Sequence, residues 1–95
     1  METIVSELQA MILKLKELGI NEVPKLKEMV ASYLAFGRKH NLSKVEYNVD
    51  YIERNELKML DLPAKKSTKA DRFKDAVREF ENILKDQIQL LESAH

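Results

Sequence analysis

The last third of the chain, from Lys69 to Ser93, carries the longest unbroken helical pattern in the sequence and limits what the chain can fold into. Apolar residues recur at alternating steps of four and three, with no proline or glycine between them. A helix of about 25 residues is some 40 Å long. Its wide apolar stripe must pack against other helices of the same chain or of a second copy. The stripe contains Phe73, Ala76, Val77, Phe80, Ile83, Leu84, Gln87, Ile88, Leu90 and Leu91.

A first helix is predicted from Glu2 to Leu18, where apolar residues recur with the same spacing. Gly19 follows, and glycine readily adopts the left-handed conformation that ends many helices. Asn21 is suited to be the N-cap of a second helix, because its side-chain oxygen can accept a hydrogen bond from a helix amide. The connection between Gly19 and Asn21 is therefore short, which predicts that the two helices are antiparallel neighbours or a sharply bent pair.

The second helix has an apolar stripe that includes Tyr33 and Gly37. Because glycine lowers helix propensity, Gly37 on this face is best explained as room for a neighbouring backbone. The helix is expected to end in the basic run that precedes Asn41, and asparagine there can adopt the left-handed conformation.

The segment 44–62 fits two kinds of structure. Its apolar residues alternate with polar ones as in a half-buried strand, so a short hairpin is one interpretation. The other is a helix, in which Glu56 intrudes on the apolar stripe and favours a break near Asn55. The helix is preferred because an isolated hairpin is only marginally stable. On the helical interpretation the core residues are Val45, Val49, Ile52, Met59 and Leu60.

Two helix starts have the spacing of a capping box, Ser43 with Glu46 and Thr68 with Asp71. The sequence therefore predicts a single all-α domain over residues 1–95, a small bundle of three to four helices with a long C-terminal helix. The alternative is an α+β fold with a short hairpin around 44–62.

Charge and composition narrow the possible functions. The 16 Lys and Arg residues balance the 16 Asp and Glu residues, so no overall field attracts nucleic acid or an anionic membrane. The absence of cysteine excludes disulfides and a thiol nucleophile, and it suits a reducing compartment. The apolar runs are too short to span a bilayer, and the start Met1-Glu2 does not resemble a signal peptide. We expect a cytoplasmic protein that does not associate with membranes.

Few residues are suited to catalysis or metal binding. The two histidines, His40 and His95, lie at a predicted helix end and at the end of the sequence, without the spacing of paired metal ligands. Asp71, Asp75 and Glu79 recur at steps of four, but their cationic neighbours indicate a solvated face. There is no glycine-rich phosphate loop. We therefore expect no enzymatic activity and no cofactor.

Nucleic-acid binding is an alternative, because basic residues gather around 38–44 and 65–72. Two such clusters on one face would bind phosphates despite the zero net charge. Residues 30–52 also faintly resemble a helix-turn-helix, with Gly37 small and Asn41 at the turn, although Tyr47 and Asp50 do not suit the apolar anchor positions. The candidate residues are Arg38, Lys39, Lys44, Lys65, Lys66, Lys69 and Arg72.

Protein binding is the function that the sequence favours. Wide apolar helix faces and four methionines provide adaptable contact surface. Gln87 either fixes the register of a paired helix or lies at the edge of the core. Tyr47 and Tyr51 are either partly exposed interface aromatics or half-buried core tyrosines. We predict a non-catalytic adaptor, inhibitor or assembly subunit that binds another protein as a homodimer or hetero-complex. The candidate contact residues are Tyr47, Tyr51, Phe80, Leu84, Gln87 and Leu91.

Overall fold

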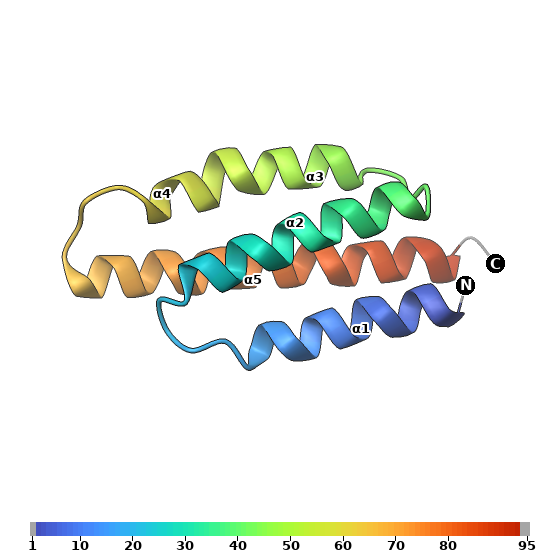
Figure 1. Ribbon diagram of the computed structural model, residues 1–95, viewed down its shortest axis with the longest axis horizontal. Coiled ribbons are helices and arrows are strands. Elements are labelled where there is room, and N and C mark those ends of the chain that lie inside the picture. The colour runs from blue at the N-terminus through green and yellow to red at the C-terminus, as the bar shows by residue number, and fades with distance from the viewer. Residues whose placement is uncertain (1, 94–95) are drawn as a thin grey trace.

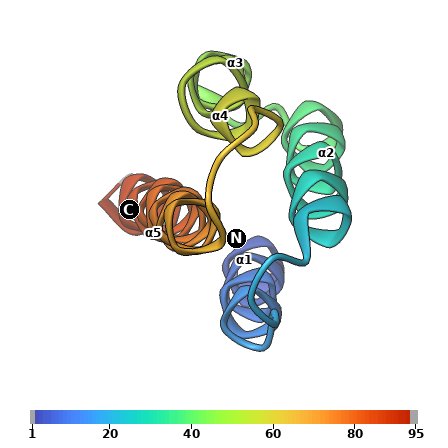
Figure 2. The same ribbon diagram turned by 90° about the vertical axis from the view of Figure 1, so that its left-hand side faces the viewer.

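Four helical rods, each antiparallel to the next along the chain, make up the computed structural model, which describes residues 2–93 (Figure 1). They are α1 (Glu2–Lys16), α2 (Val23–Lys39), a third rod of α3 (Val45–Ile52), η1 (Glu53–Leu57) and α4 (Lys58–Leu60), and finally α5 (Lys66–Ser93). Seen end-on, the rods lie at the corners of a square, with α5 diagonally opposite α2 (Figure 2). The predicted all-α bundle is confirmed. No strand occurs within residues 2–93, so the hairpin alternative for 44–62 is wrong.

The apolar stripes of the rods meet inside this square. At its centre the rings of Tyr33 and Phe80 pack edge to face, with centroids 5.8 Å apart. Burying one such side chain stabilises the fold by about 2 kcal/mol. The apolar face of α5 is therefore covered by helices of its own chain. The buried core consists of Leu8, Ile12, Leu15, Leu26, Val30, Tyr33, Val45, Val49, Ile52, Leu57, Leu60, Phe73, Ala76, Phe80, Ile83, Leu84, Ile88 and Leu91.

The connection between α1 and α2 differs from the prediction. Gly19 does not have a positive φ, and the left-handed residue is Asn21, with φ 68°. Asn21 therefore turns the chain and is not the N-cap, a position that Glu22 occupies. The Glu22 carboxylate accepts a hydrogen bond of 2.7 Å from the Gly19 amide. This bond, together with Lys25, lowers the pKa of Glu22 below its ordinary value.

The end of α2 follows the prediction. Asn41 is left-handed, with φ 55°, and the Leu42 amide donates a 2.9 Å hydrogen bond to the Gly37 carbonyl, as in a Schellman motif. Gly37 leaves room for the start of α3, although the neighbour is a side chain and not a backbone. A Cβ on Gly37 would lie only 2.5 Å from Val45 Cγ1.

The third rod is continuous, and its middle, η1, is a π-helical turn. The Lys58 amide donates to the Glu53 carbonyl five residues earlier. This wider turn brings Leu57 to the core five residues after Ile52, whereas an unbroken α-helix would direct Glu56 inward. The break predicted here is thus a change of helical phase, and Glu56 remains half-buried at the flank. The rod buries Val45, Val49, Ile52, Leu57 and Leu60, whereas Met59, predicted for the core, is exposed.

The two capping boxes predicted at the starts of α3 and α5 do not form. The N-cap of α3 is Lys44, which has no side-chain cap, and Glu46 pairs instead with Arg38 at 2.7 Å. The last helix, α5, begins at Lys66, which places Thr68 inside the helix and not at its N-cap. Within residues 2–93, each helix falls short of the length or apolar character needed to cross a membrane.

Candidate functional site

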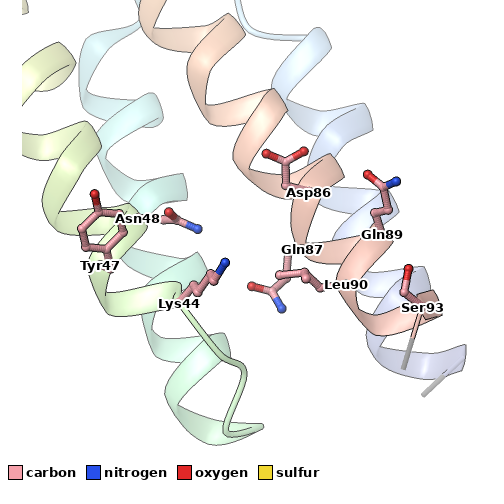
Figure 3. A pocket seen from close by; sticks show the side chains of 8 residues that line it. All are labelled: Lys44, Tyr47, Asn48, Asp86, Gln87, Gln89, Leu90 and Ser93. Atoms are coloured by element: carbon pink, nitrogen blue, oxygen red, sulfur yellow. The ribbon is translucent and has the colours of Figure 1, made fainter. Parts of the chain in front are cut away.

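A pocket of about 630 Å³ lies between the start of α3 and the C-terminal part of α5 (Figure 3). We call it the α3–α5 pocket. Three of its residues, Lys44, Tyr47 and Gln87, are among those predicted from the sequence to take part in binding. The bundle brings them together although they come from helices far apart in the chain. The pocket is lined by Lys44, Tyr47, Asn48, Asp86, Gln87, Gln89, Leu90 and Ser93.

Gln87 is the buried polar residue of this pocket, with only 2 % of its surface exposed. Its Oε1 accepts a 3.2 Å hydrogen bond from the Tyr33 hydroxyl. Burial raises the pKa of Tyr33 to about 12, so this hydroxyl keeps its proton at neutral pH. The Gln87 Nε2 group has no acceptor among residues 2–93. Every fully buried side-chain nitrogen or oxygen in that range has a hydrogen-bond partner, so an unpartnered Nε2 must be in part accessible. Nε2 is therefore open to the pocket.

Lys44 approaches the pocket from the start of α3. Its backbone is left-handed, with φ 65°, a conformation that costs energy for a residue with a Cβ atom. Its ammonium group and the side-chain amides of Asn48 and Gln87 extend into the space between the two helices (Figure 3). Together these groups offer several N–H donors. Asp86, on the α5 side, is the carboxylate among the lining residues.

Apolar surface borders the mouth of the pocket. Tyr47 is 72 % exposed and Leu90 is 41 % exposed, and both line the pocket. Tyr51 follows Tyr47 by one helical turn and is 45 % exposed. The structure thus places Tyr47 largely in solvent, whereas Tyr51 is about half exposed.

The other residues predicted for protein contact are internal. Phe80, Leu84 and Leu91 are buried in the core, and Gln87 is buried with them. The reason is that α5 faces the other three rods, so its apolar stripe packs within the chain (Figure 2). In the single chain Phe80, Leu84 and Leu91 are not available for contact with a partner, whereas Gln87 reaches the α3–α5 pocket.

The two basic clusters lie at opposite ends of the bundle, whose long axis extends over 46 Å (Figure 1). Residues 38–44 are at the α2–α3 connection, and residues 65–72 are at the start of α5. Arg38 pairs with Glu46, and the Arg72 guanidinium donates to the carbonyls of Met59 and Leu62. The two clusters are therefore separated along the long axis of the bundle. The exposed cations of the two clusters are Arg38, Lys39, Lys44, Lys65, Lys66 and Lys69.

The geometry of residues 30–52 also differs from a helix-turn-helix. There α2 and α3 lie side by side as an antiparallel hairpin (Figures 1 and 2), whereas the helices of a helix-turn-helix cross steeply. Asp50, at one anchor position of that motif, is exposed and pairs with Arg54 at 3.1 Å. Tyr47, at the other, is exposed as well.

A carboxylate cluster lies where η1 meets α5. Burial raises the pKa of Glu56, and the negative charges of Glu79 and Asp75 raise it further, whereas Arg78 opposes them. Arg78 is also the ion-pair partner of Asp75, at 2.8 Å. Within the part of the chain that the structure describes, no group of three or more His, Asp or Glu side chains is arranged to hold a metal ion.

Sequence reasoning missed most of the polar lining of the α3–α5 pocket, namely Asn48, Asp86, Gln89 and Ser93. These residues belong to no motif and come from two helices whose pairing is known only from the fold. The signals in the sequence were Gln87, a polar residue inside an apolar stripe, Tyr47 as a candidate interface aromatic and Lys44 as part of a basic cluster. No family model matches the chain, and no curated protein or solved structure is significantly similar to it.

Proposed function

We propose that this protein is a non-catalytic interaction module that binds another protein through Tyr47 and Tyr51 of α3 and Leu90 of α5, which we call the α3–α5 face. The observation that carries the proposal is the exposure of two aromatic side chains on successive turns of one helix, 72 % and 45 %. The partner is a second copy of this chain or a different protein.

The chemistry of tyrosine supports this role. A tyrosine ring buries about 150–250 Å² on contact and loses only two side-chain torsions, so it gains much contact area at low entropic cost. Its hydroxyl remains able to form hydrogen bonds at a wet interface. The apolar residues of α3 already pack inside the bundle, so Tyr47 and Tyr51 are the large side chains that α3 offers to a partner.

The first test is the solution mass by light scattering over a range of concentrations, for the wild type and for a Tyr47→Ser/Tyr51→Ser double variant. Both positions are exposed, so each substitution should change the free energy of unfolding by no more than about 0.5 kcal/mol. A wild-type dimer that the double variant cannot form identifies the partner as a second copy. A dimer that persists in the variant contradicts the proposed face.

If the wild type is monomeric, the test moves to a different partner. A photo-crosslinking side chain is placed at Tyr51 and, as the control, at Leu13, which is 63 % exposed on α1. The proposal expects a discrete adduct at position 51 that excess wild type suppresses and the double variant does not. Equal labelling from both positions, or equal competition by the variant, would contradict it.

A further inference from the structure

The α3–α5 pocket combines a buried hydrogen-bond donor, a cation and an apolar border. We propose that it is a binding site for a carboxylate joined to an apolar group. Two sources share this chemistry, the C-terminal residue of a peptide and a small organic acid. The proposal goes beyond protein contact at the α3–α5 face, because it concerns the interior of the pocket and a ligand defined by its charge.

Gln87 is the buried hydrogen-bond donor of the pocket. Its Oε1 is occupied by the Tyr33 hydroxyl at 3.2 Å, which directs Nε2 into the pocket as a donor. Only 2 % of the Gln87 surface is exposed. A donor held in so enclosed a position gains more from an ionised acceptor than a surface amide does, because competing water is limited.

Lys44 and Asn48 complement this donor from the opposite wall. Their side chains extend toward the same space as Gln87 (Figure 3), so an ionised oxygen there can accept from an ammonium group and from side-chain amides. Lys44 also occupies a left-handed position, φ 65°, that glycine or asparagine would adopt at lower energy.

The apolar border and the volume define the rest of the ligand. Leu90 and Tyr47 give the pocket apolar sides, which suit a hydrocarbon side chain next to the carboxylate. The volume of about 630 Å³ lies within the usual range for small-ligand sites. Asp86 disfavours an anion, so its charge provides a test of the ligand's sign.

The experiment is a two-dimensional NMR titration with N-acetyl-leucine at neutral pH, where its carboxylate is ionised. N-acetyl-leucinamide, which has the same apolar group but no charge, is the matched control. We expect saturable shifts of the side-chain amide signals of Asn48 and Gln87 and of the Lys44 backbone amide, with the acid only. An equal response to the amide, a response that does not saturate, or shifts located elsewhere would overturn the proposal.

Variants test the charges separately. Lys44→Gly should weaken binding by about tenfold, the loss of one charge-assisted hydrogen bond, while its unfolding midpoint stays equal or rises because glycine accepts the left-handed backbone. Lys39→Gln removes a positive charge of the 38–44 basic cluster that does not line the pocket, and its affinity should stay within twofold of the wild type. Asp86→Asn should strengthen binding. Weaker binding of N-acetyl-leucine by Asp86→Asn together with stronger binding by Lys44→Gly would mean that these two charges do not act on the carboxylate as described, and it would overturn the proposal.

Two further ligands identify the source of the carboxylate. Acetate that binds as tightly as N-acetyl-leucine would overturn the apolar part of the proposal. An acetylated tripeptide with a free C-terminal leucine that binds more tightly than N-acetyl-leucine would support the proposal and assign the site to peptide C-termini. Equal or weaker binding of the tripeptide, with N-acetyl-leucine still bound, would support it for a small organic acid.

Discussion

The Tyr33 hydroxyl of α2 donates a 3.2 Å hydrogen bond to Oε1 of Gln87 on α5, across the diagonal of the bundle (Figure 2). Both side chains are almost fully buried, and the Tyr33 ring also packs against Phe80. One polar contact in an apolar core thus relates two helices that are not adjacent in the square. It also orients the amide that opens into the α3–α5 pocket.

Removing the Tyr33 hydroxyl should destabilise the fold. Tyr33→Phe keeps the ring but leaves the Gln87 oxygen without its donor, so we expect a loss of about 1–3 kcal/mol in the free energy of unfolding. Urea denaturation monitored by circular dichroism measures it. The double variant Tyr33→Phe/Gln87→Met should lose less than the sum of the two single variants. Strict additivity would show that the hydrogen bond contributes no coupling.

Adding a single methyl group at Gly37 should destabilise the contact between α2 and α3. A Cβ there would lie 2.5 Å from Val45 Cγ1, so Gly37→Ala should cost about 1–3 kcal/mol although alanine favours helices. Thermal and urea unfolding test this. Combining it with Val45→Ala should cost less than the two single changes together. Gly19→Ala is the control, because its Cβ would meet Glu22 at an ordinary 3.5 Å and the glycine φ is not positive.

The π-helical turn should be removable by deleting one residue. Without Asn55, the step from Ile52 to the next core leucine becomes four residues, and the third rod can continue as an α-helix with the same buried face. We expect the deletion variant to fold with similar helical content. Deleting Asp50 instead moves Ile52 out of the core register and should destabilise the protein strongly. Equal loss of stability in both deletions would contradict the role assigned to η1.

A charge at the centre of the core should prevent folding. Phe80→Asp places a carboxylate where the native ring is fully buried, so we expect the cooperative circular dichroism melt to disappear. Phe80→Ala should retain the fold at a cost of about 3–5 kcal/mol. An unchanged melt and elution volume for Phe80→Asp would mean that α5 does not pack as described.

Glu56 should make stability depend on pH in a defined direction. Burial and the negative charges of Glu79 and Asp75 raise the pKa of Glu56 in the folded state, so its ionised form opposes folding. Its contribution to the free energy of unfolding therefore falls as pH rises through the interval between the ordinary and the raised pKa. Glu56→Gln should be more stable than the wild type at neutral pH, and this advantage should shrink as the pH falls toward 4.

Urea unfolding at several pH values measures this difference. Glu53→Gln, an exposed change in the same turn, is the control for a lost surface charge. An advantage of Glu56→Gln that stays constant from neutral to acidic pH would contradict the assignment to titration of Glu56.

Sequence periodicity was sufficient for the long C-terminal helix, for the second helix and for its left-handed end at Asn41, because these depend on local spacing and backbone preference. It was not sufficient for the candidate site. Tyr47 and Gln87 were both singled out, but their meeting at one pocket depends on how α3 lies against α5. Asn48 and Asp86 carried no signal at all, since a polar residue on a helix resembles ordinary surface until its neighbours are known.

Local spacing was enough to predict the first, second and last helices, each with one apolar side, and to place Gly37 on such a side. It left segment 44–62 open between a helix and a hairpin. How those sides are used depends on the packing of the helices against one another. This packing covered Phe80, Leu84 and Leu91 within the chain and left Tyr47 and Tyr51 in solvent. It also changed the helical phase at η1, so that Leu57 and not Glu56 faces the core. The physical reason is that periodicity specifies which residues share a face, whereas burial depends on which face another helix covers.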